Sequence, residues 1–249
     1  MKALKAVAAT FLVSALLTAP AGAQIVDELS RRQALQLYRI GQQLLVAEQF
    51  EKAEEQFAKA VELDPLLTLA HYGRGQALMA LRRYASAVQA LRRCREAYEQ
   101  IASLRQRDAA ESDRLQREEI NELRESVARV RTGQIRGAGP ALLQRLEARL
   151  EDLERTRATS VGRLHTPAEV SLALGSASFR NGQIEEAEEQ WKAAVVVNPR
   201  FGEALNNLAA LYAITGRKKQ AEDAVRAAER SGFRVNPQLK DDIRQMAAN

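Results

Sequence analysis

The sequence predicts an all-α protein, and its composition supports this fold class in two ways. Alanine, leucine, glutamate, glutamine and arginine, which are good helix formers, dominate the chain. Only 13 glycines and 6 prolines occur in 249 residues, whereas an all-β fold needs many tight turns. We therefore expect helices throughout.

The first 23 residues have the composition of a signal peptide. Lys2 and Lys5 precede an uncharged run over residues 6–18, and Ala21-Gly22-Ala23 fits the small-residue rule for signal peptidase. The run is shorter than the roughly 20 residues that cross a bilayer. We expect cleavage before Gln24 and a periplasmic or secreted protein with no transmembrane segment. The alternative interpretation is a buried N-terminal helix.

The charge balance argues against a nucleic-acid partner. The formal net charge of +5 falls to +3 once Lys2 and Lys5 are removed. No aromatic residues interleave with the basic clusters, such as Arg217-Lys218-Lys219, as they would on a base-stacking surface. These clusters are expected to be solvated helix ends.

A 34-residue repeat then organises the chain into four copies, at 34–67, 68–101, 168–201 and 202–235. Small residues recur at equivalent positions of the copies: Gly41, Gly75, Gly175 and Ala209, then Ala53, Ala87, Ala187 and Ala221. With Phe57, Trp191, Pro65 and Pro199, these positions resemble the tetratricopeptide repeat (TPR) family, whose unit is a helix–turn–helix of this length. The resemblance implies a solenoid of stacked helical hairpins.

Physical reasons support the same register. The small residues permit two helices of one hairpin to touch, while Phe57 and Trp191 fill the gap between hairpins. Pro65 and Pro199 end the second helices, because proline excludes its predecessor from the α region. We expect an N-terminal pair at 24–101, a C-terminal pair at 168–235, and a capping helix at 236–249 that starts at Pro237.

Residues 102–167 do not follow the repeat and are predicted to form an antiparallel coiled-coil hairpin with a linker. No glycine or proline lies between Gln76 and Thr132, so one uninterrupted helix is expected to reach the glycines at 133–139. A second helix follows from Pro140 to about Ala158. The apolar stripes of the two helices meet in one antiparallel register: Ile120, Leu123, Val127 and Val130 face Leu153, Leu150, Leu146 and Leu143.

Charge suggests that this hairpin is an exposed rod. Residues 95–158 carry 13 basic and 13 acidic side chains, several of them in helix-stabilising pairs four residues apart. We therefore expect the hairpin to pair within itself and to be dispensable for folding of the repeats.

The sequence contains no constellation for catalysis, a metal or a cofactor. Cys94 is the one cysteine, and His71 and His165 have no partner at metal-ligand or triad spacing. Cys94 replaces the small residue of the sister copies, so a buried and inert thiol is expected rather than a reactive one. No catalytic residue, metal site or cofactor is predicted, and the chain is not expected to be an enzyme.

The TPR resemblance implies that the first helices of the repeats line a concave groove that holds a peptide or a partner helix. The implied groove residues are Tyr38, Gln42, Tyr72, Gln76, Leu172, Ser176, Phe179, Asn206 and Asn207. Asn207 matches an asparagine with which many family members hold a ligand's backbone. Tyr38 and Gln42 replace the Lys and Asn of the carboxylate clamp of chaperone-binding members, which makes an acidic C-terminus a doubtful ligand. Ordinary packing is the alternative role for Tyr38, Tyr72 and Phe179.

Two functions follow as hypotheses. The first is an exported scaffold or adaptor that binds a protein or peptide in the cell envelope through the groove. The alternative is a structural protein that docks or forms homo-oligomers through the coiled-coil hairpin. An enzyme accessory subunit has little support, because catalytic residues are missing.

Overall fold

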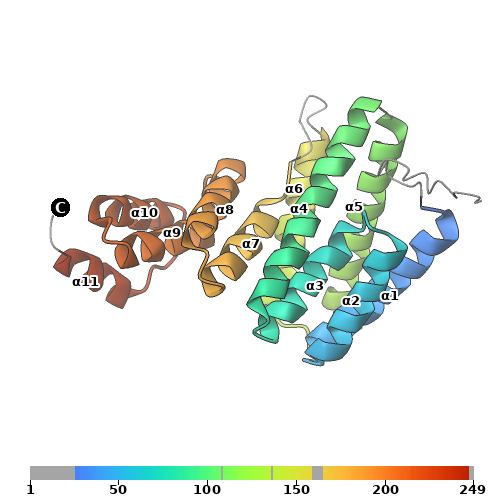
Figure 1. The fold of residues 1–249 in the computed structure, drawn as a ribbon, viewed down its shortest axis with the longest axis horizontal. Helices are drawn as coiled ribbons and strands as arrows, with labels where there is room; N and C mark the ends of the chain where they lie inside the picture. Colours follow the sequence, from blue (N-terminus) through green and yellow to red (C-terminus); the bar gives the residue numbers. More distant parts are fainter. Residues whose placement is uncertain (1–25, 108, 136, 159–164, 247–249) are drawn as a thin grey trace, which may run out of the picture.

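The computed structural model describes residues 26–107, 109–135, 137–158 and 165–246, and every regular element in these ranges is an α-helix (Figure 1). The predicted signal peptide lies outside the described residues. The helices, in chain order, are α1 (Glu28–Val46), α2 (Phe50–Leu63), α3 (Thr68–Ala80), α4 (Tyr84–Arg107), α5 (Ala109–Arg131), α6 (Pro140–Ala158), α7 (Ala168–Arg180), α8 (Ile184–Val197), α9 (Gly202–Ile214), α10 (Lys218–Arg230) and α11 (Pro237–Gln245). The all-α class is confirmed.

The four predicted repeats are four helical hairpins, α1–α2, α3–α4, α7–α8 and α9–α10, whose two helices pack on each other. Within three of them a glycine lies against a large side chain of the second helix: Gly41 against Phe57, Gly75 against Leu91 and Gly175 against Trp191. In the fourth, Ala209 and Ala221 are both fully buried. The pairing of small with large residues is what permits the close approach of the helices.

The close approach at Gly175 gives a testable prediction. A Cβ atom there would lie 2.6 Å from Trp191 Cδ1 and 3.1 Å from the backbone oxygen of Ala187, and neither group can move freely. Gly175→Ala is therefore expected to lower the free energy of unfolding by about 1–3 kcal/mol through overpacking. Gly139→Ala is the control, because a Cβ there would meet nothing within 4 Å. Equal urea midpoints for the two variants would contradict the packing described.

The helix ends also follow the sequence signals. α2 ends at Leu63 and α8 at Val197, and the next residue in each case, Asp64 or Asn198, has extended backbone before its proline. α11 begins at Pro237, where the side chain of Asn236 accepts a hydrogen bond from the backbone of Gln238. Its buried Ile243 packs on α9 and α10, as expected of a C-terminal capping helix.

The two repeat pairs form one continuous stack, a question that the sequence left open. α4 packs against α7, so the third hairpin follows directly on the second. Leu78 and Leu91 share an apolar cluster with Leu174, and Arg92 Nη2 pairs with Glu186 Oε2 at 2.6 Å across this junction. The stack therefore has a single concave side to which both pairs contribute.

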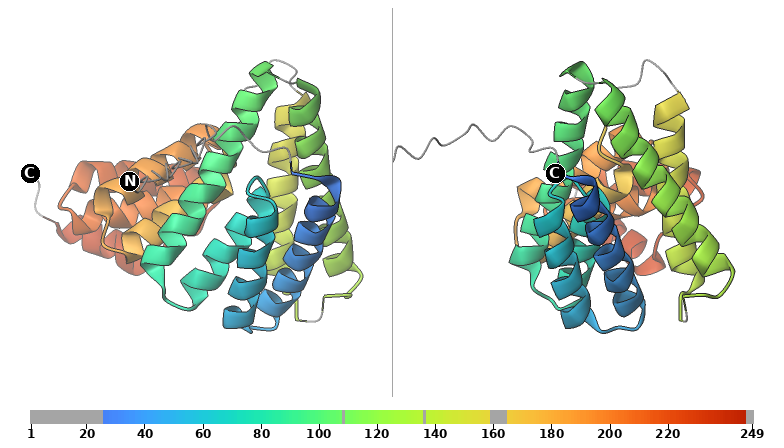
Figure 2. Two further views of the ribbon diagram at one scale, coloured as in Figure 1. Left: turned by 45° about the vertical axis from the view of Figure 1, so that its right-hand side comes forward. Right: turned by 90° about the vertical axis from the view of Figure 1, so that its right-hand side faces the viewer.

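The prediction of one uninterrupted helix from the second repeat to the glycines at 133–139 is wrong. The chain forms two helices instead, since α4 ends at Arg107 and α5 begins at Ala109. The two helices pack side by side, as Figures 1 and 2 show. The sequence between Leu104 and Leu115 has no large apolar residue to support a straight rod. Reversal brings the apolar residues of α5 back onto the N-terminal pair, where they are buried.

α5 and α6 do pair antiparallel as predicted. Three ion pairs cross between them: Arg131 with Glu147 at 2.6 Å, Arg124 with Glu154 at 2.7 Å and Glu119 with Arg149 at 2.9 Å. The first two pairs show the antiparallel arrangement, because the residue number falls from Arg131 to Arg124 on α5 while it rises from Glu147 to Glu154 on α6. The side chains of the predicted stripes that are buried are Ile120, Leu123, Val127, Leu146 and Leu153.

The prediction that this hairpin is an exposed rod, in contrast, is wrong. Leu123, Val127 and Leu146 belong to the same apolar core as Tyr38 and Phe57 of the N-terminal pair. The stripes of α5 and α6 are thus buried against each other and against α1–α4 at once. The hairpin lies along one side of the first two repeats (Figure 2). An apolar stripe specifies that a face is buried but not what covers it, and here the repeats cover part of it.

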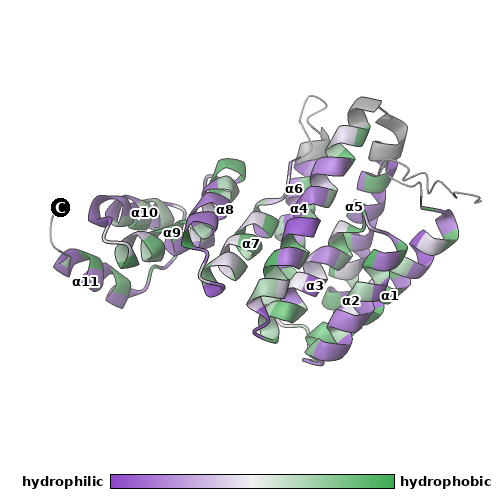
Figure 3. Ribbon diagram, in the orientation of Figure 1, coloured by the Kyte–Doolittle hydropathy of each residue, from purple (hydrophilic) through white to green (hydrophobic). Residues whose placement is uncertain are grey.

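Every helix carries both hydrophilic and hydrophobic residues, as the mixed colours of Figure 3 show. Such amphipathic helices bury one face and solvate the other. Over the described ranges, no helix combines the length and the apolar character that a membrane span requires.

Candidate functional site

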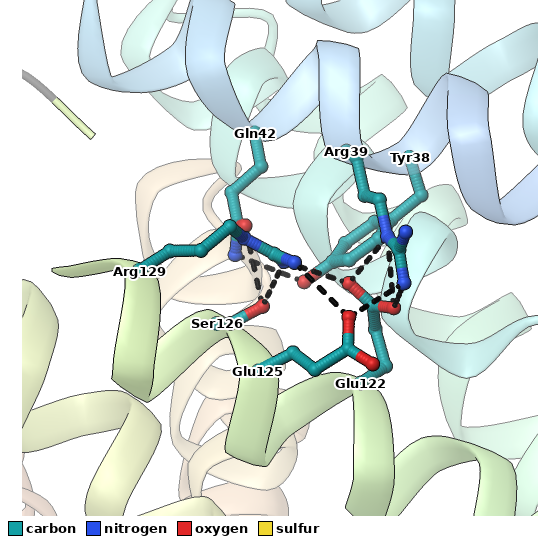
Figure 4. Close-up of polar contacts among 7 residues, drawn as sticks. All are labelled: Tyr38, Arg39, Gln42, Glu122, Glu125, Ser126 and Arg129. Carbon is teal, nitrogen blue, oxygen red and sulfur yellow. Dashed lines mark hydrogen bonds and ion pairs between the residues drawn. The ribbon is translucent and has the colours of Figure 1, made fainter. Parts of the chain in front are cut away.

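The first half of the predicted groove is filled by α5. Tyr38 and Gln42, on the inner face of α1, are only 4% and 6% exposed. Gln42 Nε2 donates to the Tyr38 hydroxyl at 3.0 Å, and Gln42 Oε1 accepts from Ser126 Oγ of α5 at 3.4 Å (Figure 4). Burial raises the pKa of Tyr38, so its hydroxyl stays neutral. Both predicted groove residues are therefore held by the chain's own helix.

Charged groups fix α5 in this position (Figure 4). Glu122 of α5 is 3% exposed and lies between two arginines. Arg39 Nη2 of α1 pairs with its Oε2 at 2.6 Å, and Arg129 Nη2 pairs with its Oε1 at 2.8 Å. Arg39 also reaches Glu125 at 2.8 Å. A buried carboxylate needs such partners, because desolvation alone would make its charged form unfavourable.

A second buried charge, that of Arg149 on α6, joins the hairpin to α3 and α4. Its Nη2 donates to the Tyr98 hydroxyl at 2.6 Å and to Glu119 Oε1 at 2.9 Å. The guanidinium also lies over the Tyr72 ring, 4.8 Å from the centroid. Burial raises the pKa of Tyr72 to about 12. Both tyrosines are thus neutral partners of an enclosed positive charge.

The second half of the groove is open. A cleft of about 660 Å³ lies between α3, α7 and α9 on the stack and the start of α6 on the hairpin. Six predicted groove residues from both repeat pairs line it: Tyr72, Gln76, Leu172, Ser176, Asn206 and Asn207. The concave face of the continuous stack therefore brings these residues to one cavity, whose lining is the candidate binding site. Their role in binding stays a prediction.

Asn206 and Asn207 are the polar residues best placed to hold a peptide backbone. Both side chains line the cleft, and within the described part of the chain neither amide has a hydrogen-bond partner. An amide group can donate and accept at the same time, which suits a peptide unit. Ser176 is less available, because its hydroxyl donates to the Leu172 carbonyl oxygen at 2.9 Å.

Phe179 takes a different place from the other predicted groove residues. Its ring packs on Trp191, with 5.6 Å between the ring centroids, and it does not line the cleft. This contact stabilises the α7–α8 hairpin. Its contribution to a groove stays a prediction.

The cleft also has walls that sequence reasoning missed. The loop after α10 contributes Phe233, and the hairpin tip contributes Gly137, Ala138, Gly139, Leu142 and Arg145. Only the tertiary fold brings these segments to the cleft. Glu169 and Glu203 also line it, and the repeat could have pointed to them, because they occupy the position of Leu35 and Leu69 in the first two copies.

Cys94 and His71 are two titratable groups outside the cleft, and both are buried. Cys94 is fully buried, its Sγ donates to the Thr68 carbonyl oxygen at 3.4 Å, and burial raises its pKa to about 12. The inert, buried thiol is thus confirmed. His71 is also buried, with Nε2 2.9 Å from the Pro65 oxygen, and burial lowers its pKa. Among the residues that the structure describes, no three His, Cys, Asp or Glu side chains are grouped as metal ligands.

A sequence profile of the tetratricopeptide repeat matches residues 38–102 and 172–233, which together are about half of the chain. The chain belongs to the tetratricopeptide repeat family. The two matched ranges coincide with the two repeat pairs and leave out the α5–α6 hairpin. No curated protein matches the chain.

Solved structures with a similar fold include three at low sequence identity. PilW, described as a widely conserved type IV pilus biogenesis factor, is 16% identical, with 86% of this chain and 82% of PilW covered and a TM-score of 0.37. YrrB, described as a TPR protein with an unusual peptide-binding site, is 18% identical over 85% of this chain and 92% of YrrB, with a TM-score of 0.30. MamA is 15% identical over 88% of this chain and 98% of MamA, also with a TM-score of 0.30.

Proposed function

We propose that this TPR protein is an exported, non-enzymatic scaffold that binds a protein or peptide partner of the cell envelope in the cleft between its repeat pairs. The observation that carries the proposal is the cleft itself. It gathers groove residues of both pairs around two amides that have no hydrogen-bond partner among the described residues. Export rests on the signal-peptide composition of the first 23 residues.

The size and lining of the cleft fit a peptide segment. A volume of about 660 Å³ lies within the range of about 300–1,000 Å³ that is usual for ligand pockets. Apolar side chains such as Leu172, Met79 and Leu142 line the cleft together with the two amides. The apolar walls supply contact area, and the amides supply hydrogen bonds that do not depend on the ligand's side chains.

The alternative, oligomerisation through the hairpin, has less support. Leu123, Val127 and Leu146 are buried against the chain's own repeats and offer no apolar seam to a second copy. Equilibrium sedimentation separates the two functions. A monomer at micromolar concentration would remove the oligomer hypothesis.

The groove function is tested by Asn207→Ala in an affinity capture from the native envelope fraction, with cross-linking. Loss of both hydrogen bonds of the amide is expected to weaken the captured complex by about 1–3 kcal/mol, roughly a 5- to 150-fold rise in Kd. Asn121→Ala is the matched control, since Asn121 is an exposed asparagine of α5 that does not line the cleft. Equal capture by both variants, each with wild-type stability, would reject the cleft as the binding site.

A further inference from the structure

Glu169 is a buried carboxylate in the wall of the cleft. It is the second residue of α7, it is 8% exposed, and it lines the cleft together with Tyr72 and Leu172. Its Oε2 atom has no hydrogen-bond partner among the described residues. Buried polar atoms are nearly always paired, so an unpaired buried oxygen on a carboxylate that lines a cleft points to a missing cation or donor.

The helix N-terminus does not explain this residue. Acidic side chains are favoured in the first turn, and Glu185, the second residue of α8, shows the ordinary case because it is exposed. Glu169 is desolvated instead, and this burial raises its pKa. Its position therefore carries an energetic cost that the helix dipole only partly offsets.

The neighbouring charged groups leave Glu169 incompletely neutralised. After burial, the largest influence on its pKa is a hydrogen bond from its own backbone N–H, which lowers the pKa; on α6, Asp152 raises the pKa, while Arg149 and Arg155 lower it. Arg149 Nη2 already donates to Tyr98 and Glu119, and Arg155 lies 3.5 Å from Glu151. No ion pair joins Glu169 to either arginine in the described residues.

The charge of the cleft is opposite in sign to that of the protein. Its charged lining residues are Glu169, Glu203 and Arg145, a local excess of one negative charge in a chain with a net charge of +5. Glu203, at the corresponding position of the next repeat, is exposed and extends the acidic side of the cleft. Leu172 and Phe233 supply apolar surface beside these carboxylates.

We propose that the cleft recognises a segment of the partner protein that presents a lysine or arginine side chain to Glu169. This inference rests on the proposed function and names the chemistry of the ligand. The aliphatic stem of the side chain lies along Leu172 and Phe233, and its charged head pairs with the Glu169 carboxylate. Asn206 and Asn207 hold the adjacent backbone, so affinity comes from the main chain and selectivity from the basic residue.

Four pools of synthetic heptapeptides test this chemistry. Each pool has a fixed central residue, which is Lys, Arg, Gln or Glu, and random residues at the other positions. Binding of each pool to the full-length mature protein is measured by fluorescence anisotropy. The Lys and Arg pools are expected to bind about tenfold more tightly than the Gln pool. This factor lies at the lower end of the gain in affinity that a charge-assisted hydrogen bond provides. Glu169→Gln should bring the Lys and Arg pools down to the Gln pool and leave the Gln pool unchanged. Glu185→Gln, the matched control, should keep the wild-type preference.

The outcomes separate the inference from the function on which it rests. Failure of every pool to bind the wild-type protein would overturn the groove function, and the inference with it. Binding without a preference for Lys or Arg, or a preference that survives in a folded Glu169→Gln protein, would overturn the inference alone. If Glu169→Gln does not fold, the preference of the wild-type protein still decides: a central Lys or Arg that gives no advantage over Gln rejects the proposal.

Discussion

Replacing Arg149 with methionine is expected to lower the free energy of unfolding by about 3–5 kcal/mol, the usual cost of removing one partner of a buried ion pair. The Arg149 side chain is 4% exposed and that of Glu119 is 9% exposed, so the change leaves Glu119 charged in a low-dielectric site. It also removes the donor to the Tyr98 hydroxyl and the cation over the Tyr72 ring. Urea denaturation followed by circular dichroism measures the effect.

Arg124→Met is the matched control for this prediction. Arg124 also joins α5 to α6, through Glu154 at 2.7 Å, but both side chains are largely solvent-exposed. Exposed pairs contribute about 0–1 kcal/mol, so this variant should be close to wild type. An equal loss in the free energy of unfolding of both variants would show that the Arg149 ion pair is no more important for stability than an exposed one.

Deleting the α5–α6 hairpin is expected to unfold the N-terminal pair and to leave the C-terminal pair folded. Joining residue 104 to residue 165 through a flexible Gly/Ser linker would uncover Tyr38, Leu69 and Tyr98, which share a core with the hairpin. Each large apolar side chain removed from this core contributes about 1.5–3 kcal/mol. The sum over the hairpin is comparable with the whole stability of a small domain, about 5–15 kcal/mol.

Hydrogen exchange resolves this prediction by segment. Protection should fall in α1, α2 and α3 and persist in α9 and α10, whose apolar core contains no hairpin residue. Protection of α1–α3 equal to that in the full chain would support the dispensable rod that the sequence predicts. A global loss of helix would show instead that the C-terminal pair depends on the rest of the stack.

The occupied first half of the concave face bears on how the protein can bind. Tyr38 and Gln42 hydrogen-bond to each other, and Gln42 also accepts from Ser126 of α5, while Glu122 and Arg39 hold that helix in place. Under the proposed function, only the second half of the face, between the tip of the hairpin and α9, is left for a partner. This division explains why the predicted groove residues that line the cleft come from α3, α7 and α9, while Tyr38 and Gln42 of α1 do not line it.

The sequence by itself determined the repeats, their small and large contact residues, the ends of α2 and α8, and the antiparallel pairing of α5 with α6. These features depend on neighbours within one or two helices, such as Gly41 with Phe57 or Arg131 with Glu147, and periodicity reports them directly. Six of the nine predicted groove residues likewise line one cleft, because the 34-residue repeat brings equivalent positions to one face.

Only the tertiary structure decided where the hairpin lies and which residues complete the cleft. The stripe of Ile120, Leu123 and Val127 requires burial, but the same stripe fits a self-contained rod or a docked helix. Its position depends on the reversal between α4 and α5, and on long-range partners such as Arg39 for Glu122. The burial of Glu169 depends on the same docking, because α6 packs against α7 beside it. Local periodicity carries no information about such contacts, which arise from the free energy of the whole chain.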